Sequence, residues 1–247
     1  MSNKIGYLTI DDSPSGSMEK KTNILFENDI PAVFFCSGVH LEENPEAVVR
    51  AIKKGYIIAN HAYNHPHFSD ISLKECLDQI KKTDELVEKI YERAGTGIPG
   101  KFFRFPFGDK GGLNYADYLK PLSEEGLMRK NAIQDLLKKL GYFQPEFRGV
   151  TYHYYRDAGL LKDIDWYWTF DLMEWSTFIE KPVQGLDSEE KVIERMDRYF
   201  SEGKSEPPPP DSEEIILIHD HPETDDFFNR LIRHLLTKNI TFRMPDF

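Results

Sequence analysis

The chain has 247 residues, of which 40% are hydrophobic and 30% are charged, ordinary values for a globular protein with a sizeable core. Its formal net charge of -11 repels phosphate backbones and anionic membrane surfaces, so we expect neither a nucleic acid nor a membrane as a partner. No uninterrupted apolar stretch reaches the roughly 18 residues that a membrane-spanning helix needs.

Cysteine content and the first residues bear on the cellular compartment. Cys36 and Cys76 are the only cysteines, which favours a reducing compartment over a disulfide scaffold. The sequence from Met1 to Lys4 leads into an apolar run without the basic, apolar and small-residue regions of a secretory signal. We therefore expect a cytoplasmic protein, and the sequence leaves its oligomeric state open.

Short apolar runs alternate with helical patterns from one end of the chain to the other. The predicted strands are residues 5–10, 32–36, 56–60, 101–105, 147–152, 166–170, 215–218 and 240–243. Such alternation implies parallel strands joined by helical crossovers, and seven or eight such units indicate a barrel.

The helices are marked by capping signals and apolar spacing. The clearest one begins with the capping box Ser72-x-x-Glu75 and ends near Gly95. Another is predicted to start with Asn44 as N-cap and Pro45 in the first turn, and two more span about 187–200 and 224–236. Residues 108–125 and 203–212 are irregular, and we expect the proline run 207–210 to be an extended connection.

Polar side chains fall at the carboxyl ends of the predicted strands, the end that holds the active site in barrels of parallel strands. They are Asp11 and Asp12 after the first strand, His61 after the third, Arg104 in the fourth, Asp171 and Glu174 after the sixth, and His219 after the seventh. We expect these side chains to converge.

The doublet Asp11-Asp12 and the pair His61-x-x-x-His65 predict metal-assisted hydrolysis. Two imidazoles and one carboxylate suit a first-row divalent metal, and the second carboxylate is free to move protons. The alternatives are a turn in which Asp12 caps a helix and a pair of surface histidines. We assign no ligand role to the remaining histidines, which are His40, His67, His153, His221 and His234.

Arg104 and His219 each lie in an apolar strand, where a polar side chain needs a hydrogen-bonding or ionic partner. Burial of a guanidinium in the run Phe102 to Phe107 would destabilise the fold unless a carboxylate pairs with it, and Asp11 is the candidate. The alternative is that the arginine side chain extends to the surface. His219 needs a backbone carbonyl or a carboxylate, and Asp171 or Glu174 would raise its pKa.

Taken in order, these segments match five motifs of one known family. They are Thr9-Ile10-Asp11-Asp12-Ser13-Pro14, His61-x-x-x-His65, Arg104-x-Pro106-Phe107-Gly108, Asp171-x-x-Glu174-Trp175 and Leu217-Ile218-His219-Asp220. In this order and combination the chain resembles the polysaccharide deacetylases of carbohydrate esterase family 4.

The resemblance implies a single catalytic domain over 1–247, folded as a distorted (β/α) barrel of seven to eight mostly parallel strands. It implies removal of N-acetyl groups from amino sugars in a poly- or oligosaccharide. One divalent metal is implied, with zinc first and cobalt, manganese, nickel and iron as alternatives. By position, Asp12, His61 and His65 resemble the family's metal ligands. Asp11 resembles its catalytic base, and Arg104 resembles the residue that orients this base. His219 resembles the general acid, and Glu174, with Asp171 nearby, resembles the carboxylate that adjusts the pKa of this acid. Phe107, Trp175 and Leu217 fall among the substrate-binding positions.

The chain departs from the family pattern at several points. Ser13 replaces a glycine, Phe107 a tyrosine and Glu174 an aspartate, and residues 109–147 form a longer segment than the family leads us to expect. Three other functions stay open. They are a hydrolase of the same fold acting on a small non-sugar amide such as a cyclic ureide or imide, a non-haem iron oxygenase, and a carbohydrate-binding protein that has lost catalysis.

Overall fold

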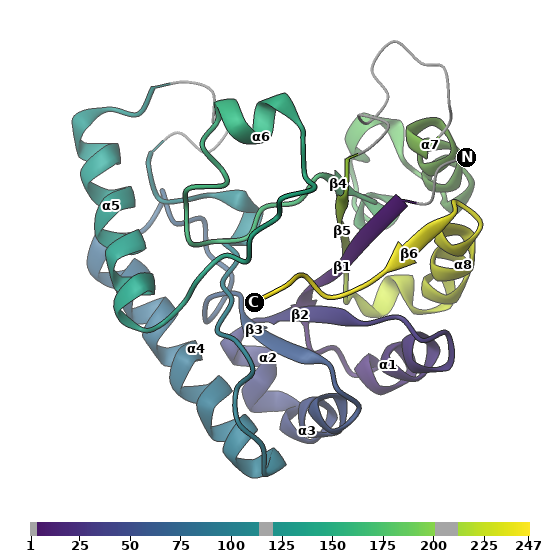
Figure 1. Ribbon diagram of the computed structural model, residues 1–247, viewed down its shortest axis with the longest axis horizontal. Coiled ribbons are helices and arrows are strands. Elements are labelled where there is room, and N and C mark those ends of the chain that lie inside the picture. The colour runs from purple at the N-terminus through teal and green to yellow at the C-terminus, as the bar shows by residue number, and fades with distance from the viewer. Residues whose placement is uncertain (1–3, 114–120, 201–211) are drawn as a thin grey trace.

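A parallel sheet forms the centre of the computed structural model, which describes residues 4–113, 121–200 and 212–247. Its strands lie in the order β3-β2-β1-β5-β4, and β6 pairs with the beginning of β1 (Figure 1). The strands are β1 (Lys4–Ser13), β2 (Ala32–Cys36), β3 (Ile57–Asn60), β4 (Phe170–Asp171), β5 (Glu214–His219) and β6 (Ile240–Phe242). Every pairing is parallel, as the alternating pattern predicts.

Irregular segments close this sheet into a distorted barrel, and the predicted fold class is confirmed. Asn60 donates its backbone N–H to Phe102 and accepts from Arg104, at 2.9 and 3.1 Å. Trp166 N–H donates to the Phe103 carbonyl at 2.8 Å, and the chain then runs into β4. Six strands rather than seven or eight are regular among the described residues.

Two predicted strands are absent for local reasons. Residues 101–105 make only isolated bridges, because Pro106 has no N–H with which to continue a ladder. In 147–152, the Val150 N–H closes a turn on the Phe147 carbonyl at 3.0 Å, so this segment fills the barrel with side chains without adding a strand.

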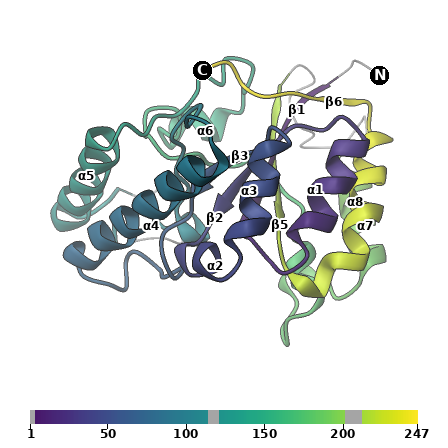
Figure 2. The same cartoon turned by 90° about the horizontal axis from the view of Figure 1, so that it is seen from below.

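Helices surround the barrel (Figures 1 and 2). In both views α4 lies beside α5, and α1 lies beside α8. The helices are α1 (Met18–Glu27), α2 (Gly38–Glu43), α3 (Pro45–Lys53), α4 (Leu73–Ala94), α5 (Glu124–Lys139), α6 (His153–Asp157), α7 (Glu189–Phe200) and α8 (Asp225–Leu236), with short 3-10 turns at Pro106–Gly108, Glu174–Thr177, Val183–Gly185 and Pro222–Thr224. No helix in the described part of the chain combines the length and apolarity required to cross a bilayer.

The helices marked by sequence signals are present. The capping box at Ser72 and Glu75 starts α4, and Gly95 ends it in the left-handed conformation. Pro45 begins α3, although Asn44 makes no side-chain cap. The sequence did not reveal α1, α2, α5 and α6. Part of the predicted insertion forms α5, whereas residues 114–120 and the proline run 207–210 lie outside the described residues.

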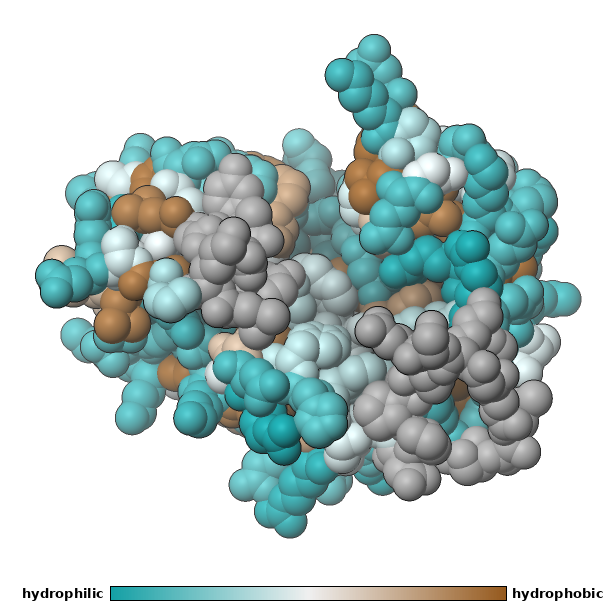
Figure 3. Space-filling model, turned by 90° about the horizontal axis from the view of Figure 1, so that it is seen from above, coloured by the Kyte–Doolittle hydropathy of each residue, from teal (hydrophilic) through white to brown (hydrophobic). Residues whose placement is uncertain are grey.

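Alternation along β1 decides which side chains enter the barrel. Leu8 and Ile10 belong to the core shared with the outer helices, whereas Tyr7 belongs to the core inside the barrel. Because side chains alternate in a strand, Thr9 and Asp11 also point inward. The outer surface is mostly hydrophilic on the face seen in Figure 3.

Candidate active site

A pocket with a volume of about 560 Å³ opens at the carboxyl ends of the central strands. Most of the predicted site residues line it, namely Asp11, Asp12, His61, His65, Phe107, Asp171, Trp175, Leu217 and His219. The two that do not, Arg104 and Glu174, are fully buried directly behind it. The structure thus brings together all the residues that the sequence singles out.

The end of β1 is irregular, and this irregularity presents both aspartates to the pocket. The pairing register with β2 shifts between Ile10 and Ser13, and Asp12 has a φ of 62°. In a regular strand Asp11 and Asp12 would point to opposite faces. Strained backbone of this kind is common at functional sites.

Asp12, His61 and His65 form a set suited to a divalent metal. Their donor atoms lie within 4.8 Å of one another, and Asp12 Oδ1 is 3.0 Å from His65 Nε2 and 3.6 Å from His61 Nε2. The Nδ1 of His61 is 2.8 Å from the Arg104 carbonyl. A proton on that nitrogen leaves the Nε2 lone pair facing the carboxylates, as a metal ligand requires.

The pKa shifts of Asp12 and His61 also fit a metal. Burial lowers the pKa of His61, which favours the neutral imidazole. Burial alone would raise the pKa of Asp12, but hydrogen bonds from His221 and His65 outweigh it and hold this pKa well below its ordinary value. A carboxylate and neutral imidazoles are the forms that bind a metal.

Arg104 pairs with Asp11 inside the barrel. Its Nη1 donates to Asp11 Oδ1 and to Thr9 Oγ1, each at 2.8 Å, and its Nε donates to the Trp166 carbonyl at 3.2 Å. The guanidinium also stacks over Phe35 at 4.3 Å. Asp11 Oδ2 remains on the pocket side, 3.6 Å from His61 Nε2. Arg104 therefore fixes one oxygen of Asp11 and leaves the other for chemistry.

His219 and Glu174 form a second pair across the pocket. Glu174 Oε1 lies 3.2 Å from His219 Nδ1 and also accepts the His219 backbone N–H. Burial opposes the imidazolium, but the Glu174 carboxylate outweighs burial and raises the pKa of His219 to about 10. Burial likewise raises the pKa of neighbouring Asp171 to about 6. Of the two predicted partners of His219, Glu174 makes the contact.

The rest of the pocket wall is aromatic and apolar. Phe107, with a φ of 57° and 53% exposed, stacks on His67 at 3.8 Å and meets the edge of His65 at 4.5 Å. Trp175 lies against His219 with ring centroids 6.2 Å apart. Phe178 and Ile179 complete this wall.

Six other lining residues were not among the predicted site residues, namely Ser37, His40, Trp168, Phe178, Ile179 and His221. His221 Nε2 lies 3.1 Å from Asp12 Oδ2, although we assigned it no role. Its spacing of two from His219 was the available signal, since residues at i and i+2 of an extended segment share a face. Thr9, also missed, sits two positions before Asp11 for the same reason.

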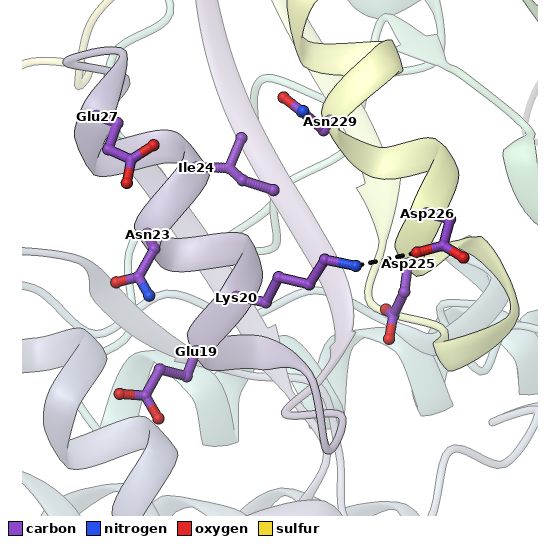
Figure 4. Close-up of a pocket in the computed structure, with 8 residues that line it drawn as sticks. All are labelled: Glu19, Lys20, Asn23, Ile24, Glu27, Asp225, Asp226 and Asn229. Atoms are coloured by element: carbon purple, nitrogen blue, oxygen red, sulfur yellow. Dashed lines mark hydrogen bonds and ion pairs between the residues drawn. The ribbon is translucent and has the colours of Figure 1, made fainter.

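A second hollow lies between α1 and α8 and is mainly polar (Figure 4). Its acidic side chains include Glu19, Glu27 and Asp226, and Lys20 reaches across to Asp226 at 3.1 Å. Among the described residues that line it there is no histidine or cysteine, so it does not offer the imidazole donors of the first pocket.

The structure is a barrel of parallel strands with a group of carboxylate and imidazole donors at the carboxyl ends of the strands that could hold a metal ion. A sequence profile described as polysaccharide deacetylase matches residues 1–125. The chain belongs to the polysaccharide deacetylase family, as the motifs predict.

Individual proteins are similar over parts of the chain. A peptidoglycan-N-acetylglucosamine deacetylase of Bacillus cereus is 33% identical over 103 residues, 41% of this chain and 36% of that protein. A chitin deacetylase of Colletotrichum lindemuthianum is 29% identical over 121 residues, 44% of this chain and 47% of that protein. The aligned region is therefore less than half of each of these relatives.

The fold is shared over nearly the full chain. A family 4 carbohydrate esterase from Streptomyces lividans, solved in complex with acetate, superposes with a TM-score of 0.60 and 22% identity. The superposition covers 99% of this chain and 94% of that one. The chain therefore shares the overall fold of this esterase.

Proposed function

We propose that this protein is a metal-dependent hydrolase that removes N-acetyl groups from amino sugars of a poly- or oligosaccharide. One observation carries the proposal. Asp11 and His219 are register partners on β1 and β5, each held by its own buried partner, beside the Asp12, His61 and His65 set. Hydrolysis of an amide needs a base for the water and an acid for the amine.

The metal would be held by Asp12, His61 and His65, with zinc as the first candidate. When bound, a dication at such a site activates water and polarises a carbonyl, which is worth several kcal/mol in comparable sites. Zinc suits two imidazoles and one carboxylate, and cobalt, manganese, nickel and iron accept the same ligands.

The protein side chains move the protons. Asp11 accepts a proton from the attacking water through Oδ2, while Arg104 keeps Oδ1 and the plane of the carboxylate fixed. His219 donates its proton to the departing nitrogen, which would otherwise leave as an unstable anion. Glu174 holds the imidazole by Nδ1, so Nε2 is the nitrogen that acts. The backbone N–H of Phe107 is proposed to assist the carbonyl oxygen.

The names of the relatives and the lining of the pocket support this substrate class. The similar proteins are named as deacetylases of peptidoglycan, chitin and chitooligosaccharides. Trp168, Trp175 and Phe107 offer flat apolar faces for a sugar ring.

The apolar wall supports one further candidate, hydrolysis of a compact non-sugar amide such as a cyclic ureide or imide. Phe178 and Ile179 are among the residues that line the pocket, and its volume is about 560 Å³. A ring amide of small size would be enclosed there more completely than a long polymer.

The test combines metal quantification with product release. The purified protein is loaded with zinc, and acetate is measured from N-acetylglucosamine oligomers of increasing length and from a panel of small amides. We expect one bound metal per chain and chelator-sensitive acetate release. If only the small amides are turned over, the substrate is a small amide and not a sugar. Oxygen-dependent turnover with bound iron would indicate an oxygenase. Sugar binding without acetate release would indicate a binding protein.

A further inference from the structure

The two oxygens of the Asp12 carboxylate contact different histidines in the part of the chain that the structure describes. Asp12 Oδ1 faces His65 and His61, whereas Oδ2 lies 3.1 Å from His221 Nε2. One oxygen of the carboxylate thus contacts the histidines of the proposed metal site, and the other contacts His221. His221 itself is outside the set of donor atoms that lie within 4.8 Å of one another.

The backbone of His221 is anchored by a buried ion pair. Lys21 Nζ donates to the His221 carbonyl at 3.0 Å and pairs with Asp220 at 2.6 Å. Asp220 also accepts from the backbone N–H and the hydroxyl of Ser15, each at 2.7 Å. Lys21 and Asp220 are 0% and 2% exposed. Segments from both ends of the chain therefore determine where His221 stands.

The ring of His221 is held from its sides as well. It lies nearly parallel to His219, with centroids 5.7 Å apart, and meets the edge of Phe178 at 5.3 Å. Its side chain is 29% exposed, so it belongs to the pocket wall rather than to the core.

We propose that His221 is a positioning residue for the metal ligand Asp12, donating Nε2–H to Oδ2 so that Oδ1 alone is directed at the metal. This inference rests on the metal site of the proposed function. Hydrogen bonds to the free oxygen of a ligating carboxylate fix its orientation, and their loss weakens metal binding about 10- to 100-fold in comparable sites.

The test measures zinc affinity by competition with a chromophoric chelator and needs no catalytic readout. We expect His221→Ala to bind zinc about 10- to 100-fold more weakly than the wild type. His221→Gln should retain most of the affinity, because its amide N–H reaches a similar position. The visible spectrum of bound cobalt should keep the wild-type band shape in His221→Gln, since no ligand has changed.

His234→Ala is the matched control. His234 Nε2 also meets a carboxylate, that of Asp197, at 2.7 Å, but on α8 and away from the pocket. We expect its zinc affinity to equal that of the wild type. Thermal unfolding without metal checks that each variant is folded.

The outcomes separate this inference from the proposed function. Unchanged zinc affinity in His221→Ala would overturn the positioning role, even if its acetate release fell. An equal loss in His221→Gln and His65→Ala, with an altered cobalt spectrum, would make His221 a ligand and overturn it too. A wild type that binds no metal would overturn both proposals, whereas normal metal binding without acetate release would overturn only the deacetylase.

Discussion

The buried contact between Arg104 and Asp11 determines how the aspartate can act. One oxygen of Asp11 is occupied by the guanidinium, and the other faces the pocket beside His61. Asp12, one residue later, binds the histidines. Two adjacent residues of the same type thus have different surroundings, which allows them different tasks.

Replacing Asp11 separates these tasks. In Asp11→Asn the amide oxygen can still accept from Arg104, but the side chain no longer takes a proton. We expect acetate release to fall by about two orders of magnitude or more. Zinc affinity, measured by chelator competition, should stay near that of the wild type.

Asp12→Asn serves as the comparison, because it should lose zinc affinity together with activity. Wild-type turnover in Asp11→Asn would contradict the role of Asp11 as the base.

Glu174 controls the charge of His219, and this can be tested through pH. The carboxylate outweighs burial and raises the pKa of His219 from its ordinary 6.5 to about 10, so the imidazole stays protonated at neutral pH. Glu174→Gln removes that charge and should lower this pKa. We expect the alkaline limb of kcat/KM to move to lower pH.

The same shift predicts a sign for stability. Because the folded pKa is raised, the pair stabilises the fold fully below pH 6.5 and loses this contribution as pH rises through about 10. The difference in the free energy of unfolding between the wild type and Glu174→Gln should therefore become smaller at alkaline pH. Glu180→Gln, an exposed residue of the same loop, is the control, and an identical profile in both variants would contradict the assignment.

At the scale of elements, the carboxyl ends of the strands and the turns that follow them present the chemistry. The register shift of β1 turns Asp12 toward the pocket, and the segment after β3 places Ala62 and His65 at φ values of 63° and 57°. The N-cap of helix α4, Ser72, lies seven residues beyond His65, and it fixes where that loop ends.

The end of α4 offers a matched pair of glycines. Gly95 has a φ of +75°, whereas Gly97 does not lie in the left-handed region, and neither has an atom within 4 Å of the Cβ it would gain. We expect Gly95→Ala to lower the free energy of unfolding by roughly 1–2 kcal/mol, since only the backbone conformation penalises it. Gly97→Ala should be neutral or slightly stabilising. Urea denaturation measures both, and equal effects would contradict this explanation.

At the scale of the molecule, the two ends of the chain are joined beneath the pocket. Lys21 on α1 is buried against Asp220 and Asp225 at 2.6 and 2.8 Å. Lys20, its neighbour in sequence, lies on the outside and reaches Asp226, as Figure 4 shows. Adjacent lysines thus make one buried and one exposed bridge between the same two helical regions.

The two lysines should differ sharply in their contribution to stability. Lys21→Met leaves buried carboxylates without their cation, and we expect the free energy of unfolding to fall by roughly 3–5 kcal/mol. Lys20→Met should change it negligibly, because exposed ion pairs contribute little. Denaturant titration of both variants decides this, and a small effect in Lys21→Met would show that the buried pair is dispensable.

Patterns of residues that are close together in the sequence were sufficient to predict several elements of the fold and several residues of the site. Alternating apolar runs predicted parallel strands, and Ser72 with Glu75 predicted the start of α4. The aspartate doublet, the paired histidines, Arg104 and His219 could be assigned to one site, because the carboxyl ends of parallel strands must meet at one end of a barrel. Each of these signals depends on residues close together in the chain.

Only the tertiary structure decided the features that join distant residues. The barrel closes through a few backbone hydrogen bonds of irregular segments at Asn60, Phe103 and Trp166, which leave no periodic pattern in the sequence. Lys21 looks like any other lysine until Asp220, 199 positions away, is placed beside it. His221 likewise became part of the site only when β1 and β5 were paired. Periodicity reports which face of an element is buried, but the identity of the group across the interface depends on the packing of the whole chain.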